Sequence, residues 1–266
     1  MARPREELRE RAEEVFSEPG RDLGRVAEEL LSFVRLLRTE PQLRKALADI
    51  TVPADVKRAV LDDLFAERSE PGTSAVLQLL AEEEVAGPEL QDMAADLAVH
   101  AVLAQAEASG DLRDVEDELF RFARTLEAEP ELRAALTDPV LPLERKLALV
   151  DELVRDKVTA ETASLLRFVL QYRPEGDIGH AILELADLAA ARRERVVVEA
   201  RTAVPLDEDR RRRLAEALSR ATGKEVDLEV VEDPDVVGGV VARIGSEVID
   251  GTVKRKLELA LETLTG

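Results

Sequence analysis

The sequence predicts a mainly α-helical protein, with two repeated helical bundles followed by a small α/β domain. First, the sequence of residues 23–64 is repeated at residues 112–153, and both stretches have helical apolar spacing. Second, hydrophobic residues make up 45% of the 266-residue chain and aromatic residues only 3%, which suits Ala- and Leu-rich helices better than a β-sandwich. Third, beyond residue 195 the apolar spacing changes to the alternation of strands.

The first helical copy begins with a short charged amphipathic helix at residues 4–17, which ends near Pro19-Gly20. A longer helix follows and stops at Glu40-Pro41, because proline cannot continue it. Its apolar stripe is Val26, Leu30, Phe33 and Leu37. A short helix comes next, and Pro53 marks the start of another. The apolar residues of that last helix are Val56, Val60 and Leu64.

The second copy repeats the first at a constant shift of 89 residues, which places Glu129-Pro130 on Glu40-Pro41. Roughly half of about 39 positions from Val26 to Leu64 are identical to their counterparts, far above chance for an internal repeat. The chain therefore contains a duplicated unit with five to six helices per copy.

Three domains are expected from this pattern: residues 1–92 as an extra N-terminal bundle, 93–190 as a second bundle, and 191–266 as the α/β domain. The second bundle would open with a helix at 93–108 and close with a helix from about Ile178 to Arg195.

The α/β domain begins with a strand at Val196 that ends by Pro205, followed by a helix at 206–222. Residues 225–231 then alternate cleanly between apolar and polar. Strand, helix and strand form a crossover unit, so these two strands are expected to be parallel. A hairpin of 240–244 and 247–249 follows, with Gly245-Ser246 as its turn, and a terminal helix completes the domain.

The net charge of −20 is concentrated in the helical part, because residues 1–191 account for −18 of it. This acidity argues against binding to nucleic acid. Two interpretations stay open: a solvated surface, or an acidic face that meets basic partner segments. The chain has no cysteine, and no apolar run approaches the ~18 residues of a membrane span. We expect a cytosolic protein unless a partner holds it at a membrane.

The usual signs of catalysis are not found. His100 and His180 stand within helical stretches and, without cysteine, cannot assemble the usual metal constellations. GGVVARIG at 238–245 lacks the dinucleotide-binding spacing, and no phosphate-cradling GxxxxGK[ST] occurs. We therefore expect no catalytic residue, no metal and no cofactor. The basic clusters Arg210–Arg213 and Lys254–Lys256 are interpreted as solvated helix faces or as contacts to an acidic partner.

The C-terminal stretches DPDVVGGVVARIG (233–245) and VIDGTVKRKL (248–257) resemble the signature of the delta subunit of bacterial F-type ATP synthases, whose mitochondrial counterpart is the oligomycin-sensitivity-conferring protein. Thr252 replaces the family's usual serine, and Arg255 stands where a small residue is common. The signature residues, expected to be structural, are Gly238, Gly239, Gly245, Asp250, Gly251, Thr252 and Leu257. The additional bundle at 1–92 resembles the arrangement of actinobacterial delta subunits.

The resemblance implies a non-catalytic stator subunit at the cytoplasmic face of the cell membrane, attached only through the ATP synthase complex. It would link N-terminal helices of alpha subunits to peripheral-stalk subunit b, so that rotation is coupled to proton transport and ATP synthesis. The alpha helix is expected between the helices at 93–108 and 160–172, while 1–92 would brace subunit b or a second alpha chain. The candidate interface residues are Ala101, Leu103, Leu166, Val169, Arg255 and Leu261.

Two other classes remain open on the sequence. One is a helical-repeat scaffold or adaptor unrelated to ATP synthase, in which the copies would be equivalent. The other is an enzyme with an unrecognised site, which a turnover screen of the isolated chain would reveal.

Overall fold

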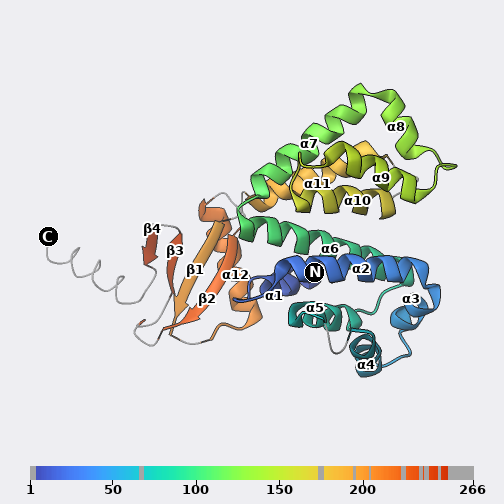
Figure 1. Cartoon of the computed structure of the whole chain (residues 1–266). Coiled ribbons are helices and arrows are strands. Elements are labelled where there is room, and N and C mark those ends of the chain that lie inside the picture. Colours follow the sequence, from blue (N-terminus) through green and yellow to red (C-terminus); the bar gives the residue numbers. More distant parts are fainter. Residues whose placement is uncertain are drawn as a thin grey trace, which may run out of the picture. The chain divides into compact units, whose positions relative to one another are not determined.

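The computed structural model describes residues 4–65, 69–172, 177–193, 196–203, 205–222, 226–233, 236, 240–244 and 247–250. The chain forms two compact units, Met1–Ala190 and Ala191–Gly266. The described part of the first unit is helical, and that of the second combines strands with a helix (Figure 1). The mainly α fold with a small α/β domain is confirmed.

The helices of the first unit follow the repeat. They are α1 Pro4–Phe16, α2 Leu23–Thr39, α3 Pro41–Ala48, α4 Ala54–Phe65, α5 Pro71–Ala81, α6 Gly87–Ser109, α7 Leu112–Ala128, α8 Pro130–Thr137, α9 Leu143–Val154, α10 Ala160–Tyr172 and α11 Ile178–Arg193. The bounds of α2, α3 and α4 recur in α7, α8 and α9 at the shift of 89 that the sequence predicts. The two copies therefore share one fold.

The Glu-Pro step shapes both copies in the same way. Glu40 ends α2 by donating its backbone N–H to the carbonyl of Leu36 at 2.8 Å, and it also precedes the first residue of α3. Glu129 does the same between α7 and α8, with a bond of 2.9 Å to Thr125. The proline that follows each glutamate needs no helical N–H partner at its position, so a new helix can begin at once in another direction.

Helix α6 is the element that the two copies share. It begins at Gly87 rather than at residue 93, because Pro88 suits the first turn, so the boundary expected between residues 92 and 93 lies inside the helix. It ends at Gly110, whose φ of 84° is a left-handed conformation that glycine adopts easily. Its buried residues lie on every side, from Leu90 to Ala106, as in a helix enclosed by a core. A single hydrophobic core consequently runs through both copies.

The second unit holds β1 Val196–Thr202, α12 Glu208–Thr222, β2 Val226–Glu232, β3 Val240–Ile244 and β4 Glu247–Asp250. The strand order is β2-β1-β3-β4, and the predicted parallel pairing of β1 with β2 is confirmed. Strand β3 pairs antiparallel with β1 and with β4, as the expected hairpin requires. Its small core consists of Ala200, Leu218, Val226, Leu228 and Ala242. The turn at 245–246 and the expected terminal helix lie outside the described residues.

Candidate partner-binding surfaces

The described candidates for a partner interface are core residues in this conformation. Ala101 and Leu103 on α6 are both 0% exposed, while Leu166 and Val169 on α10 are 1% and 3% exposed. A partner helix cannot reach these four side chains unless the bundle opens. The other two candidates, Arg255 and Leu261, lie outside the described residues.

Helices α7 and α9 also pack on α10, and part of the covering comes from helix α2 of the first copy. This helix packs along α6 and also contacts α10 (Figure 1). Leu31 and Val34 of α2 line one narrow crevice together with Phe168 and Tyr172 of α10, whose rings stack with centroids 5.2 Å apart. The face between α6 and α10, where the sequence led us to expect an alpha-subunit helix, is thus covered by the chain itself.

The equivalent face of the first copy lies between α1 and α5. By the shift of 89, Ala75 and Leu79 on α5 correspond to Ser164 and Phe168 on α10, and both are half-buried. Helix α6 contacts both α1 and α5, much as α2 contacts both α6 and α10. Ala12, Leu77 and Leu80, the counterparts of Ala101, Leu166 and Val169, are 0%, 2% and 2% exposed, so both copies bury this face.

The C-terminal end of α5 carries an acidic group on this side of the first copy. The carboxylate of Glu82 forms ion pairs with Arg11 at 2.8 Å and with Arg58 at 3.3 Å. Burial raises the pKa of Glu83, Arg11 lowers it, and the neighbouring carboxylates of Glu82 and Glu7 raise it further. The local excess of negative charge favours a partner segment with basic residues.

Each copy holds its fifth helix with the same buried carboxylate contact. Glu29 on α2 accepts the backbone N–H of Glu70 at 2.9 Å, just before α5 begins. Its counterpart Glu118 on α7 accepts the backbone N–H of Thr159 at 2.9 Å and its hydroxyl at 3.0 Å, just before α10 begins. A carboxylate at a helix N-terminus satisfies free N–H groups and the helix dipole. This contact fixes α5 on α2 and α10 on α7, which positions the faces described above.

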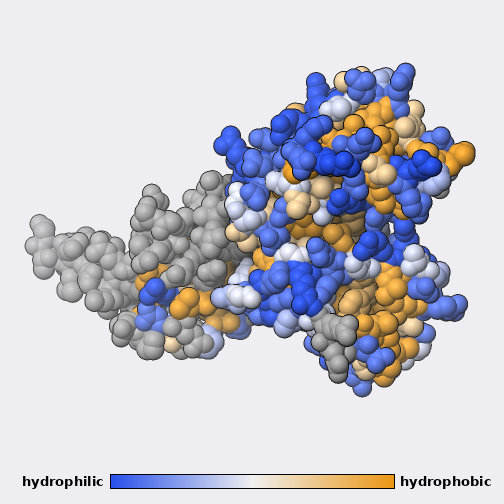
Figure 2. Space-filling model, in the orientation of Figure 1, coloured by the Kyte–Doolittle hydropathy of each residue, from blue (hydrophilic) through white to orange (hydrophobic). Residues whose placement is uncertain are grey.

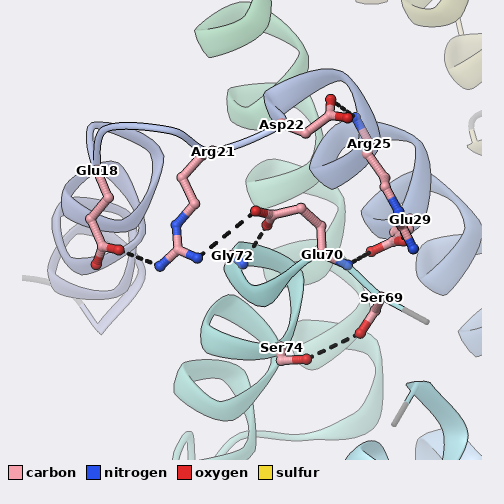
Figure 3. A network of polar contacts seen from close by, with 9 residues as sticks. All are labelled: Glu18, Arg21, Asp22, Arg25, Glu29, Ser69, Glu70, Gly72 and Ser74. Carbon is pink, nitrogen blue, oxygen red and sulfur yellow. Dashed lines mark hydrogen bonds and ion pairs between the residues drawn. The ribbon is translucent and has the colours of Figure 1, made fainter. Parts of the chain in front are cut away.

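Around that contact the first copy adds charges that the second copy lacks (Figure 3). The buried Glu70 carboxylate accepts the backbone N–H of Gly72 and lies 3.8 Å from a guanidinium nitrogen of Arg21. The positions corresponding to Glu70 and Arg21 in the second copy are Thr159 and Gly110. The second copy therefore lacks both members of this ion pair.

A polar cleft of ≈ 430 Å³ lies where α1, α6 and α10 meet. Arg5 extends from α1 to Asp92 and Asp96 of α6 at 3.4 Å and 3.9 Å, and Tyr172 of α10 donates its hydroxyl proton to Asp92. The other lining residues are Pro88 and Gln91. These contacts tie the first helix of the chain to both copies, and the cleft contains no nucleophile paired with a base.

The two histidines occupy ordinary helical positions. His100 is buried on α6, with its Nδ1 atom 3.1 Å from Glu13 Oε1 on α1, although the orientation does not make a hydrogen bond. His180 is exposed on α11, 3.3 Å from Glu184. No three His, Cys, Asp or Glu side chains of the described residues come together as a possible metal site. None of the described helices combines the length and apolarity that a membrane crossing requires.

The signature residues fall almost entirely beyond the described part. Asp250 is the last residue of β4 and pairs with Val241 of β3, as expected for the end of a strand. Gly238, Gly239, Gly245, Gly251, Thr252 and Leu257 lie outside the described residues.

The duplication also appears when the chain is compared with known proteins. The family model of the ATP synthase delta (OSCP) subunit matches residues 15–97 and again residues 99–264. The chain belongs to this family. The first match covers most of the first helical copy, and the second covers the second copy together with the α/β domain. The delta subunit is a non-catalytic structural subunit of the ATP synthase stator, so the unrelated scaffold and the enzyme are both excluded.

Full-length relatives support the same assignment. The ATP synthase subunit delta of Beutenbergia cavernae is 39% identical over 261 residues, which cover 97% of this chain and 95% of the relative. That of Frankia casuarinae is 38% identical over 244 residues, covering 91% and 88%. That of Salinispora arenicola is 40% identical over 234 residues, covering 87% and 85%. The extra helical copy is therefore shared with delta subunits of similar length.

Proposed function

We propose that this stator subunit joins N-terminal helices of alpha subunits to peripheral-stalk subunit b at the cytoplasmic face of the membrane. The family membership carries this proposal. Rotation inside the head exerts torque on it, and the stator must hold the head still for proton movement to be coupled to ATP synthesis. Long helix–helix contacts suit that task because they bury apolar stripes over a long distance and so resist torque.

The first copy is proposed as the seat of an alpha-subunit helix, because the acidic residues Glu82 and Glu83 lie at the end of its helix α5. The helix would lie along α1 and α5. An amphipathic helix placed there would contact Ala75 and Leu79, and basic residues on its flank would meet Glu82 and Glu83.

The α/β unit is proposed to bind subunit b. The basis is the family signature, which extends from β3 into the residues that follow β4. The helical unit is proposed to transmit force as one body, because α6 belongs to the core of both copies.

Removing and restoring the chain in the assembled complex tests this function. Membranes depleted of the chain should keep ATP hydrolysis by the head but lose ATP-driven proton pumping, and the purified chain should restore pumping. The isolated chain should neither bind nor hydrolyse ATP. Proton pumping that survives depletion would contradict the stator role, and saturable ATP binding at micromolar levels would contradict its non-catalytic character.

A further inference from the structure

Helix α4 presents its apolar stripe outward. Val56, Val60 and Leu64 are 47%, 39% and 50% exposed, while Lys57 and Leu61 face the core. Ile50, in the turn before α4, is 70% exposed. Figure 2 shows hydrophobic residues gathered at the lower right, over α3 and α4. Residues four apart lie on one side of a helix, so these side chains form a stripe about 12 Å long from Val56 to Leu64.

Acidic residues flank this stripe on one side. Asp55, Asp62 and Asp63 are all exposed on the same outer half of α4. Within the described residues neither Asp55 nor Asp63 forms an ion pair, and Asp62 accepts a long hydrogen bond of 3.5 Å from the side chain of Gln78. These carboxylates are therefore available to a cationic partner.

The second copy offers a weaker version of the same surface. At the positions of Val56 and Val60, α9 has Arg145 and Leu149, and the latter is half-buried. Only Leu153, the counterpart of Leu64, stays exposed, at 37%. Glu144, Asp151 and Glu152 keep the acidic flank on α9, and Val140 in the turn before α9 is 85% exposed. The uninterrupted apolar stripe on the helix is what distinguishes the first copy.

We propose that α4 is a docking surface for an amphipathic helix whose apolar stripe is flanked by lysine or arginine. The charges favour this occupant over two others. A second copy of this chain would bring more negative charge, since the net charge is −20, and an anionic membrane surface would be repelled by the same carboxylates. A contact of two to three turns is small, so it would add to a larger assembly interface rather than hold a complex alone. The surface is separate from the α1–α5 face proposed above.

The test uses the full chain and a synthetic amphipathic helix of about 18 residues, with leucines at i, i+3, i+4 and i+7 and lysines on the flanks. Its control peptide has glutamate in place of each lysine. Fluorescence anisotropy should show binding of the lysine peptide alone, weakening as salt is raised. V56R should weaken binding about tenfold or more, since it interrupts the stripe. This variant carries the arginine that α9 has at the same position, so α4 should still fold.

The matched control is L153D on α9, which should leave binding unchanged. Equal binding of both peptides, no effect of V56R, or an equal effect of L153D would each overturn the proposal. Sedimentation of the chain without peptide provides a further check. If the chain forms a dimer and V56R abolishes it, the stripe binds a second copy of this chain instead. Because the probe contains no ATP synthase sequence, failure here leaves the proposed stator function standing.

Discussion

Helices α2 and α7 occupy the same place in the repeat but meet different surroundings. Leu31 on α2 is half-buried against α10, whereas its counterpart Phe120 on α7 is 53% exposed. Ala27 is buried on α2, and the same position on α7 holds Glu116. The repeat therefore sets the fold of each copy, while the neighbour that packs on it sets which of its outer residues are buried. Duplication of a bundle does not duplicate its surfaces.

The largest expected difference between the copies lies in the core. Phe33 on α2 is 1% exposed and meets Phe65 edge-on at 5.8 Å, while its counterpart Phe122 on α7 is half-buried. F33A should lower the free energy of unfolding by about 3–5 kcal/mol. F122A should cost roughly 1–2 kcal/mol, because less apolar area is lost. Denaturant unfolding measures both, and equal costs would mean that the two helices are equally enclosed.

For the carboxylate contacts, the substitution in the second copy should cost more stability than the one in the first copy. E118A removes the acceptor for both the N–H and the hydroxyl of Thr159 and should cost about 1–3 kcal/mol. E29A should cost less, since Glu29 accepts one such bond and is also paired with exposed Arg25 at 2.8 Å. Thermal unfolding of the two variants would show this. A larger loss for E29A would indicate that the Glu70 network depends on Glu29.

The smallest expected effect concerns pH. Burial raises the folded-state pKa of Glu83, so the folded chain holds this proton more tightly than the unfolded chain. Stability from this group is therefore present in acid and is lost as the pH rises through the raised pKa. E83Q should be more stable than the wild type at neutral pH, by no more than ~0.5 kcal/mol, with no difference in acid. If E83Q is also more stable than the wild type at low pH, the gain comes from packing and not from the titration of Glu83.

Much of the fold follows from the sequence because its signals are local. The Glu-Pro steps place helix boundaries in both copies, and the alternation of 226–231 with the crossover helix predicts a parallel strand pair. The expected interface could not be placed, because apolar spacing does not tell that α6, α7 and α9 enclose α10 and that Leu166 is buried. Periodicity alone also cannot tell that the Val56 stripe faces outward. Helix α4 packs against α5, and the buried side chains of α4 are Lys57 and Leu61 rather than those of the Val56 stripe.

The seat of the alpha-subunit helix is tested most directly by labels at equivalent positions of the two copies. Ala75 on α5 and Ser164 on α10 are both small and half-buried, and the chain has no cysteine of its own. A75C and S164C would each carry a fluorescent label in the full chain, titrated with a peptide of the alpha N-terminus. The account predicts a saturable change for the label at position 75 and none at position 164. The reverse result would contradict it, because it would show that the peptide binds the second copy.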